Sequence, residues 1–463
     1  MGAVLAARKN RDGDGLRLQW AGRLWRSEER EKPLETRVKS AASMPEIKVL
    51  ERSGRGASGL SHRIVHGDNL DVTSTIEPGT VDCVYVDPPY SSDRDYVAEA
   101  RLDGPADGRA RRNLAYEDKW AIGAYLDMLA PRIEALTSLL SPRGTIWVHL
   151  DWRAAYLVRN VLDEIMGRDA FVNEIIWRRA PNLGRQATSG QFGRTLDTIV
   201  VYGREKAILH PPTRLEPIEE SAIRWDDEGR PFTSAPRGDY TDLSIAKLEK
   251  EGRIHRTASG RVYIKYFLRK DEDGVWCRER RIDALWTDVP PLRHAATSER
   301  TGYPTQKPRA LLERIIACAT DEGSLVVDGF GGSGTTAVAA HALKRRAIIC
   351  DKSPVAIATA RARLLREKAS ITVEQVAGMT TPEMTPPVVK LESNTLQLVE
   401  PTEPLAWAIG NDDGGVFNTL WHFERTLGAK TVQAKREAHV GRRPGLGVRV
   451  FGDDGSVGTW RSP

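Results

Sequence analysis

Asp87-Pro88-Pro89-Tyr90 places a carboxylate, two prolines and an aromatic ring in four consecutive residues. Proline has a fixed φ and no N–H group, so the Pro88 carbonyl enters no helix and can point into a crevice. An exocyclic amine of a nucleobase is a poor nucleophile because its lone pair is conjugated with the ring. The Asp87 carboxylate and the Pro88 carbonyl could accept its two hydrogens while Tyr90 stacks on the base. The tetrapeptide therefore favours chemistry at such an amine, and the alternative is a plain turn that ends a strand.

A glycine-rich segment lies far downstream, where Gly329, Gly331 and Gly334 fit the G-x-G-x-x-G spacing. Glycines permit a tight turn and a close approach of the backbone to a ligand at the positive end of a helix. Asp351 follows the next apolar run, where a carboxylate can accept hydrogen bonds from ribose hydroxyls. The segment predicts a nucleoside-cofactor site, and the alternative is a plain tight turn. It does not show which cofactor binds, and it is not a Walker loop because no Lys-Ser/Thr follows the last glycine.

Short apolar runs precede both motifs and alternate with patterns of helical period. Strands are predicted at 81–86, 145–150, 171–177, 197–202, 324–327 and 347–350. Helices are predicted at 152–166, 308–320, 335–343 and 354–367, and Pro131 is expected to divide the helical pattern of 120–140 into two helices. Strands that alternate with helices predict a parallel α/β sheet.

The sequence resembles the beta class of amino-directed DNA methyltransferases and is similar to the Mod subunits of type III restriction-modification systems. Asp87–Tyr90 matches the D/N/S-P-P-Y/F/W motif, and Phe330–Gly334 matches the F-x-G-x-G motif. The catalytic motif comes first, as in that class. Four further segments match, and the resemblance covers roughly residues 62–368; these segments are 67–70, 144–151, 173–177 and 301–308. Asp328-Gly329-Phe330 departs from the usual Asp-Pro-Phe.

The resemblance implies a doubly wound, Rossmann-like α/β fold with S-adenosylmethionine as cofactor. Residues 178–300 are polar, basic and only weakly periodic, which predicts an inserted target-recognition region. Residues 403–463 contain short aromatic and β-branched runs with glycine turns, which predict a small β-rich C-terminal tail. The methyl group would pass directly, in line, to an amine of a base flipped out of DNA. The residues expected to be catalytic are Asp87, Pro88, Pro89 and Tyr90. Those expected to bind the cofactor are Asp68 (adenine amine), Thr305 and Lys307 (methionine end), Asp328, Phe330, Gly331, Gly332, Gly334, Thr335 and Asp351 (ribose). No metal is expected.

The target base is predicted to be adenine, methylated at N6, because Asp at the first position of the motif leans towards adenine in this family. Cytosine N4 stays an alternative, since it also presents an amine beside a ring nitrogen. Methylation at cytosine C5 is rejected because none of the four cysteines follows a proline. An NAD-dependent oxidoreductase would leave Asp87–Tyr90 unexplained, and a non-catalytic DNA-binding module is opposed by the intact acceptors.

The chain of 463 residues is long enough for two or three domains. It has no apolar run long enough to span a membrane, no signal core and no paired cysteines, so a cytoplasmic protein is expected. The predicted organisation is a disordered basic extension (1–43), a catalytic part (44–177), a target-recognition region (178–300), a cofactor-binding part (301–370), a linker (371–402) and a small C-terminal domain (403–463).

The net charge of +5 is unevenly distributed along the sequence. Residues 1–43 and residues 178–300 each carry +4, so the rest of the chain is slightly acidic. We expect 178–300 to bind double-stranded DNA with a moderate dependence on salt, and residues 1–43 to be dispensable. Within the region 178–300, the DNA contacts are predicted at Arg178, Arg179, Asn182 and Arg185. A separately encoded restriction subunit and a homodimer are both open as further partners.

Overall fold

The computed structural model describes most of the chain, in two compact units that comprise residues 1–210 with 284–463 and residues 211–283. The described residues are 3–4, 44–54, 60–90, 94–100, 111–118, 121–181, 192–257, 259–392, 395–401, 406–413, 415–424, 437–440, 446–452 and 454–462. The extension predicted to be disordered lies outside them, except for β1 (Ala3–Val4), which pairs with β10 (Ile208–Leu209).

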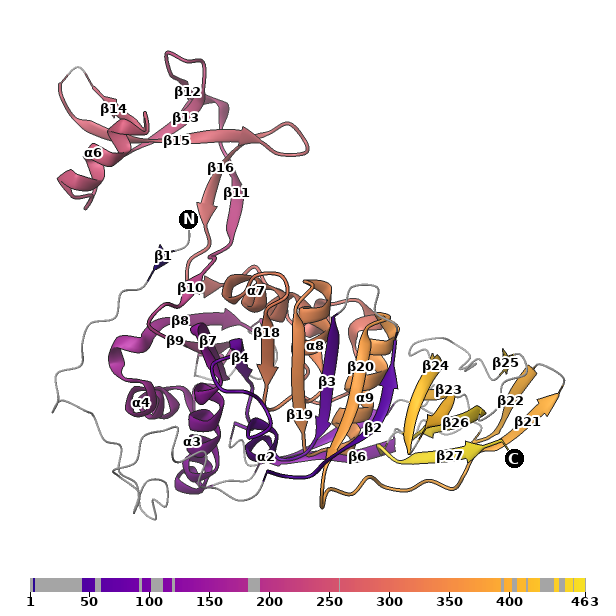
Figure 1. The fold of residues 1–463 in the computed structure, drawn as a ribbon. Helices are drawn as coiled ribbons and strands as arrows, with labels where there is room; N and C mark the ends of the chain where they lie inside the picture. The colour runs from indigo at the N-terminus through magenta and orange to yellow at the C-terminus, as the bar shows by residue number, and fades with distance from the viewer. Residues whose placement is uncertain are drawn as a thin grey trace. The chain divides into compact units, whose positions relative to one another are not determined.

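Six parallel strands form the centre of the large sheet in the first unit (Figure 1). Most of their side chains are buried, as expected for a sheet that is covered on both faces. In sheet order they are β7 (Leu140–Leu150), β4 (Val81–Val86), β18 (Leu325–Asp328), β19 (Arg346–Asp351), β3 (Ser61–His66) and β20 (Ser370–Val376). The predicted α/β fold with a parallel sheet is confirmed.

Two groups of helices cover this sheet. The first comprises α2 (Asn69–Thr73), α3 (Ile122–Ser138) and α4 (Ala155–Met166), and the second α7 (Arg309–Ala319), α8 (Thr335–Ala342) and α9 (Pro354–Arg366). The connections through α3 and α8 run in opposite directions along the sheet. Right-handed crossovers therefore place the two groups on opposite faces.

The expected division at Pro131 is wrong, because α3 continues through this residue. Proline removes one backbone hydrogen bond from a helix. Leu129 before Pro131 and Ile133 and Leu136 after it are all buried in the core under the sheet. This shared burial on both sides of the proline keeps one helix continuous.

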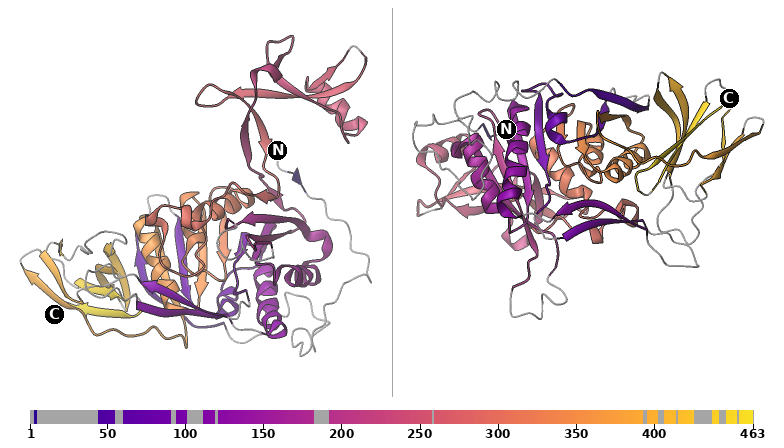
Figure 2. Two further views of the ribbon diagram at one scale, coloured as in Figure 1. Left: turned by 180° about the vertical axis from the view of Figure 1, so that it is seen from behind. Right: turned by 90° about the horizontal axis from the view of Figure 1, so that it is seen from below.

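Further strands extend the central sheet at both edges (Figure 2). Beyond β7 lie β9 (Leu196–Gly203), β8 (Phe171–Arg178) and β17 (Leu285–Trp286). Beyond β20 lie β2 (Ile47–Ser53), β24 (Val416–Glu424), β23 (Ala406–Asp413), β26 (Leu446–Phe451) and β27 (Val457–Arg461). The C-terminal part is β-rich, as its short aromatic and β-branched runs predicted, and these strands continue the central sheet.

Smaller elements complete the first unit. A three-stranded sheet contains β21 (Val388–Glu392), β22 (Thr395–Glu400) and β25 (Glu437–His439), and β5 (Arg94–Ala100) pairs with β6 (Arg111–Asp118). Short 3-10 helices lie at Arg168–Ala170, Leu292–His294 and Thr297–Glu299. Residues 371–402, predicted to be a linker, thus contain most of β20 and all of β21 and β22. Among the described residues, no helix has the length and apolar character required to cross a membrane.

The second unit is an antiparallel sheet with one helix, α6 (Asp242–Lys250). Its strands are β11 (Thr213–Pro217), β16 (Trp276–Arg281), β15 (Val262–Lys270), β13 (Pro231–Pro236), β12 (Arg224–Trp225) and β14 (Ile254–Arg256), and a 3-10 helix lies at Glu220–Ala222. Phe232, Ile245 and Ile264 are buried in it. This compact unit lies inside the predicted region 178–300 but is much shorter, because β9, β10 and β17 belong to the first unit.

Candidate active site

The two sequence motifs meet at the carboxyl ends of adjacent strands. From β4 the chain passes through α3 to β7 on one side, whereas from β18 it passes through α8 to β19 on the other. Ligands of open α/β sheets bind where the strand order diverges in this way. Asp87 directly follows β4 and the glycine loop directly follows β18, so both motifs lie at this point.

A cavity of about 270 Å³ occupies this position and is lined by residues from both motifs. All four predicted catalytic residues line it, and so does every predicted cofactor residue except Gly334. The structure therefore brings together residues that are distant in sequence. The lining residues that were predicted are Asp68, Asp87, Pro88, Pro89, Tyr90, Thr305, Lys307, Asp328, Phe330, Gly331, Gly332, Thr335 and Asp351.

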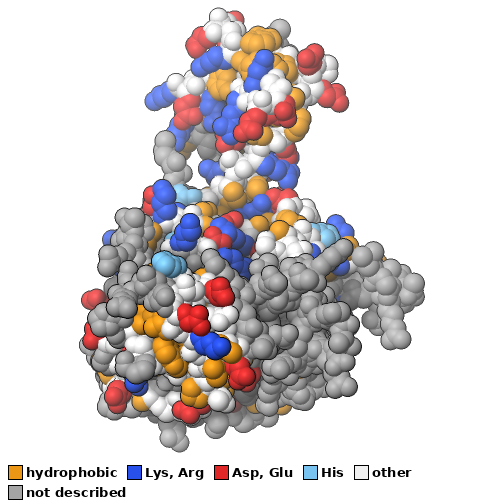
Figure 3. Space-filling view, turned by 90° about the vertical axis from the view of Figure 1, so that its right-hand side faces the viewer, with side chains coloured by type: hydrophobic (Ala, Val, Ile, Leu, Met, Phe, Trp, Pro, Cys, Tyr) orange, Lys and Arg blue, Asp and Glu red, His pale blue; other side chains and the backbone are white. Residues whose placement is uncertain are grey.

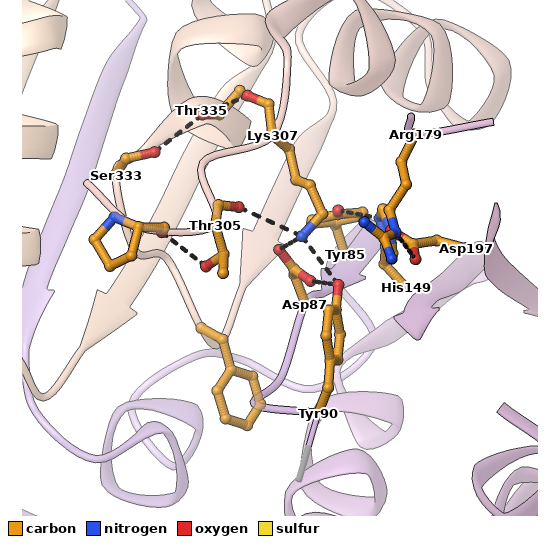
Figure 4. Close-up of polar contacts among 12 residues, drawn as sticks. Tyr85, Asp87, Tyr90, His149, Arg179, Asp197, Thr305, Lys307, Ser333 and Thr335 are labelled. Atoms are coloured by element: carbon orange, nitrogen blue, oxygen red, sulfur yellow. Dashed lines mark hydrogen bonds and ion pairs between the residues drawn. The ribbon is translucent and has the colours of Figure 1, made fainter. Parts of the chain in front are cut away.

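Lys307 contacts both polar groups of the tetrapeptide (Figure 4). Its Nζ donates to Asp87 Oδ2 at 2.5 Å and to the Tyr90 hydroxyl at 2.9 Å, and that hydroxyl donates to the other oxygen of Asp87. Burial, together with the charge of Asp87, raises the pKa of Tyr90 well above its ordinary value, so the phenol stays protonated. The Asp87 carboxylate, which is expected to accept a hydrogen bond from the amine of the base, thus already accepts one from Lys307 Nζ.

A buried polar network that the sequence did not predict lies behind Tyr90. The His149 ring stacks on that of Tyr90 and bonds the Tyr85 hydroxyl at 3.0 Å and Asp197 at 3.2 Å. Burial would raise the pKa of Asp197, but the His149 hydrogen bond and the charges of Lys307 and Arg179 lower it overall. The network fixes the orientation of the ring against which Tyr90 packs. The only sign of this network in the sequence was His149, which lies in the segment 144–151 that resembles the family.

Asp351 holds the glycine loop in place. The Gly332 N–H donates to Asp351 Oδ2 at 2.8 Å and the Ser353 N–H donates to Oδ1 at 2.8 Å. Each carboxylate oxygen has a second lone pair, so contacts with ribose hydroxyls remain compatible with these bonds. Burial raises the pKa of Asp351, opposed by these backbone donors.

Gly334 shapes the loop from behind the cavity. It is the N-cap of α8 with φ +76°, in the left-handed region that favours glycine. A Cβ at this position would lie 2.6 Å from Ala360 Cβ and 2.8 Å from Ala360 Cα. Glycine is therefore required here by conformation and by the close approach of α9.

Asp328 is almost fully buried at the base of the loop. It accepts hydrogen bonds from Thr336 Oγ1 at 2.5 Å and from the Phe330 N–H at 2.9 Å. Burial raises its pKa to about 7. Gly329, the residue that departs from the family pattern, accepts a hydrogen bond through its carbonyl from Asn69 Nδ2 at 3.0 Å.

The opposite wall of the cavity is formed around Asp68. This carboxylate caps α2 through the Leu70 N–H at 2.9 Å, and it pairs with Arg132 at 2.7 Å and Lys352 at 2.5 Å. Burial would raise the pKa of Asp68, but the contacts with Lys352, Leu70 and Arg132 lower it. Asn69 Oδ1, also in the lining, is buried and has no donor among the described residues. The sequence predicted neither of the two basic partners.

The predicted methionine end is formed by the segment before α7. Thr305 has φ +56°, and its hydroxyl donates to the Pro304 carbonyl at 2.7 Å. The Thr335 hydroxyl donates to the Lys307 carbonyl at 3.3 Å and accepts from the buried Arg363 at 2.8 Å. These contacts connect the lysine segment to the start of α8.

The predicted DNA contacts are only partly described. Arg178 is exposed at the end of β8. The guanidinium of Arg179 donates to Asp197 at 2.8 Å and to the Arg194 carbonyl at 3.1 Å. The other two predicted contacts, Asn182 and Arg185, lie outside the described residues.

Comparison with known protein families shows which family the chain belongs to. The model of the N6/N4 methyltransferase family, described as a DNA methylase, matches residues 81–362, more than half of the chain. The chain belongs to this family of DNA methylases. The family is amino-directed, and its membership covers adenine N6 and cytosine N4 alike.

Two methyltransferases are similar in sequence to this DNA methylase. The type II methyltransferase M.EcaI of Enterobacter cloacae is 26% identical over 307 residues, which cover 60% of this chain and 64% of that protein. The Mod subunit of the type III restriction-modification enzyme StyLTI of Salmonella typhimurium is 26% identical over 340 residues, covering 61% and 50%. This chain thus matches between half and two thirds of the length of these relatives.

The solved structures that match this DNA methylase are more distant. The crystal structure of the M1.HpyAVI-SAM complex has a TM-score of 0.37 and 17% identity, and the match covers 65% of this chain and 98% of that one.

Proposed function

We propose that this DNA methylase transfers a methyl group from S-adenosylmethionine to the N6 amine of adenine in double-stranded DNA. The observation that carries the proposal is the contact of Lys307 Nζ with Asp87 Oδ2 at 2.5 Å inside the cavity of the glycine loop. It places a nitrogen donor on the acceptor that an exocyclic amine would use. When bound, the cofactor supplies a methyl group on a positively charged sulfur.

The residues of the tetrapeptide bind and orient the amine. The amine replaces the Lys307 ammonium on Asp87 Oδ2 and donates its second hydrogen to the Pro88 carbonyl. Tyr90 stacks on the base, and its protonated hydroxyl keeps the other oxygen of Asp87 in place. Positioning and electrostatics are the contribution of the protein to this transfer.

The cavity fits a nucleoside cofactor with a sulfonium centre. Asn69 Oδ1 is a buried acceptor that lacks a donor among the described residues, which suits an amine or hydroxyl of the nucleoside. Asp351 has lone pairs left for ribose, and Asp68 lies on the same wall. Gly331 and Gly332 let the backbone approach the cofactor closely.

The proposal extends to partners and location. The relative StyLTI Mod is by its name a subunit of a restriction-modification enzyme, and this supports a separately encoded restriction subunit as a partner. We also propose a cytoplasmic enzyme. Light scattering of the purified protein tests for a homodimer, and copurification from the native host tests for a restriction subunit.

Sequencing that detects modified bases, applied to DNA from an expressing host, tests the reaction and identifies the base and the site. We expect N6-methyladenine at one short sequence motif. If N4-methylcytosine is found instead, the proposed target base is wrong and is cytosine. Asp87→Asn should abolish methylation while calorimetry still detects S-adenosylmethionine binding. Asp82→Asn is the matched control, because Asp82 lies in the same strand and contacts Ser141 outside the cavity. Unchanged methylation by Asp87→Asn contradicts the assigned chemistry.

A further inference from the structure

The net positive charge of the predicted DNA-binding region, 178–300, comes from a short part of it. Residues 211–283 contain 15 Lys/Arg and 15 Asp/Glu, and Figure 3 shows both kinds interspersed on the face of this unit that it draws. Residues 284–300 are also balanced. Residues 178–210 contain six Lys/Arg and two Asp/Glu, and therefore hold the whole excess of +4. A polyanion is attracted to this segment of the first unit.

Arg194, in this segment, is stacked on Trp152. Its Cζ lies 4.2 Å from the centroid of the Trp152 ring, and the tryptophan is 48% exposed. The neighbouring Arg153, whose Cζ lies 5.2 Å from the same centroid, is paired with Asp151. The Arg194 side chain has no acidic partner in the part of the chain that the structure describes.

A hydrogen bond from Arg179 fixes the backbone of Arg194. Arg179 donates to the Arg194 carbonyl at 3.1 Å and to Asp197 at 2.8 Å, and Asp197 is bonded to His149. Arg179 thus acts as a positioning residue for Arg194. The Arg194 guanidinium is a preorganised donor held against the Trp152 ring, and among the described residues no carboxylate pairs with it.

This guanidinium lies on the same edge of the sheet as the tetrapeptide. Val148 of β7 pairs with Val86 of β4, the residue before Asp87, and Trp152 follows the end of β7 by two residues. A nucleotide whose base reaches Asp87 has its backbone outside this edge. Phosphate contacts hold the strand in register while the base is out of the helix.

We propose that Arg194, supported by the face of Trp152, binds a backbone phosphate of the DNA strand that carries the target base. This rests on the proposed function, because the strand is defined by the base that Asp87 receives. The contact contributes affinity and dependence on salt. It carries no base information, so the methylated sequence does not depend on it.

The test is equilibrium binding of a fluorescent duplex that contains the methylated site, measured over a range of salt concentrations. Loss of one phosphate contact lowers the slope of log affinity against log salt by about 0.9. We expect this change in Arg194→Ala, with affinity roughly tenfold weaker at low salt. Trp152→Ala should weaken binding in the same direction, Trp152→Phe should restore it, and the double variant should lose little more than Arg194→Ala.

Arg346→Ala is the matched control, because Arg346 is an exposed arginine at the amino end of β19, on the opposite edge of the sheet. It should bind DNA as the unchanged protein does. An unchanged salt slope in Arg194→Ala overturns the inference, and so does a changed methylated sequence, which would mean that Arg194 reads a base. If the unchanged protein methylates no DNA, the proposed function has failed instead.

Discussion

The substitution Gly334→Ala tests whether the glycine loop owes its shape to the packing of α8 against α9. Alanine in the left-handed conformation costs about 1–2 kcal/mol. The added Cβ would also lie 2.6 Å from Ala360 Cβ, and overpacking of this kind costs about 1–3 kcal/mol. We therefore expect the free energy of unfolding to fall by about 2–5 kcal/mol.

Gly79→Ala is a control for the conformational part alone. Gly79 has φ +77°, almost the same as the +76° of Gly334, but its Cβ would meet no atom within 4 Å. The difference between the two variants isolates the clash with Ala360 and should be about 1–3 kcal/mol. Urea denaturation measures both unfolding free energies, provided that each transition is two-state.

Binding of S-adenosylmethionine supplies a second measurement on the same variants. A loop displaced by the methyl group that Gly334→Ala adds should bind the cofactor at least tenfold more weakly, whereas Gly79→Ala should bind it normally. Ala360→Gly removes one of the clashing atoms and should recover part of the loss when combined with Gly334→Ala. Equal destabilisation by Gly334→Ala and Gly79→Ala, or normal cofactor binding by both, would refute the reasoning.

Three further predictions concern buried charges. The pKa of Asp328 is raised to about 7, so the folded state holds a proton that the unfolded state releases, and stability should fall by up to roughly 4 kcal/mol between about pH 4 and 7; Asp328→Asn should flatten this dependence in denaturation curves. Asp197→Asn removes the charge that Arg179 and His149 share, so thermal unfolding should show a loss of about 1–3 kcal/mol, and an unchanged midpoint would contradict it. Glu51→Gln leaves the fully buried Arg361 without its carboxylate, which should cost about 3–5 kcal/mol in urea; adding Arg361→Met should recover part of it.

Local sequence signals predicted the elements that carry the site. Apolar runs such as 81–86 and 324–327 mark buried strands because each is bounded by residues that end strands. The glycines that follow the run 324–327 indicated a loop because they permit a tight turn directly after a strand. These local signals did not predict that Cys83 of β4 pairs with Val326 of β18, which places the two motifs side by side. That adjacency depends on sheet order, and only the resemblance to a family implied it.

The contacts that complete the site were beyond prediction for a related reason. Lys307 and Asp87 are 220 residues apart, and no periodicity connects them. The pair of Asp197 and His149 is also non-local, since 48 residues separate them. The predicted linker 371–402 also contains most of β20, which is buried between β3 and β2. The Pro and Thr residues that suggested a linker follow β20, from residue 380 onwards.

The order of strands in the central sheet also has a consequence for synthesis and assembly of the chain. Strand β4 emerges from the ribosome long before β18, its neighbour in the sheet, so its apolar edge stays unpaired during translation and is exposed to aggregation. The unit at 211–283 separates the two strands in the chain. A cut inside this unit would leave Asp87 in one fragment and the glycine loop in the other. Methylation by the mixed fragments would then report their reassociation, which makes this enzyme a candidate split reporter.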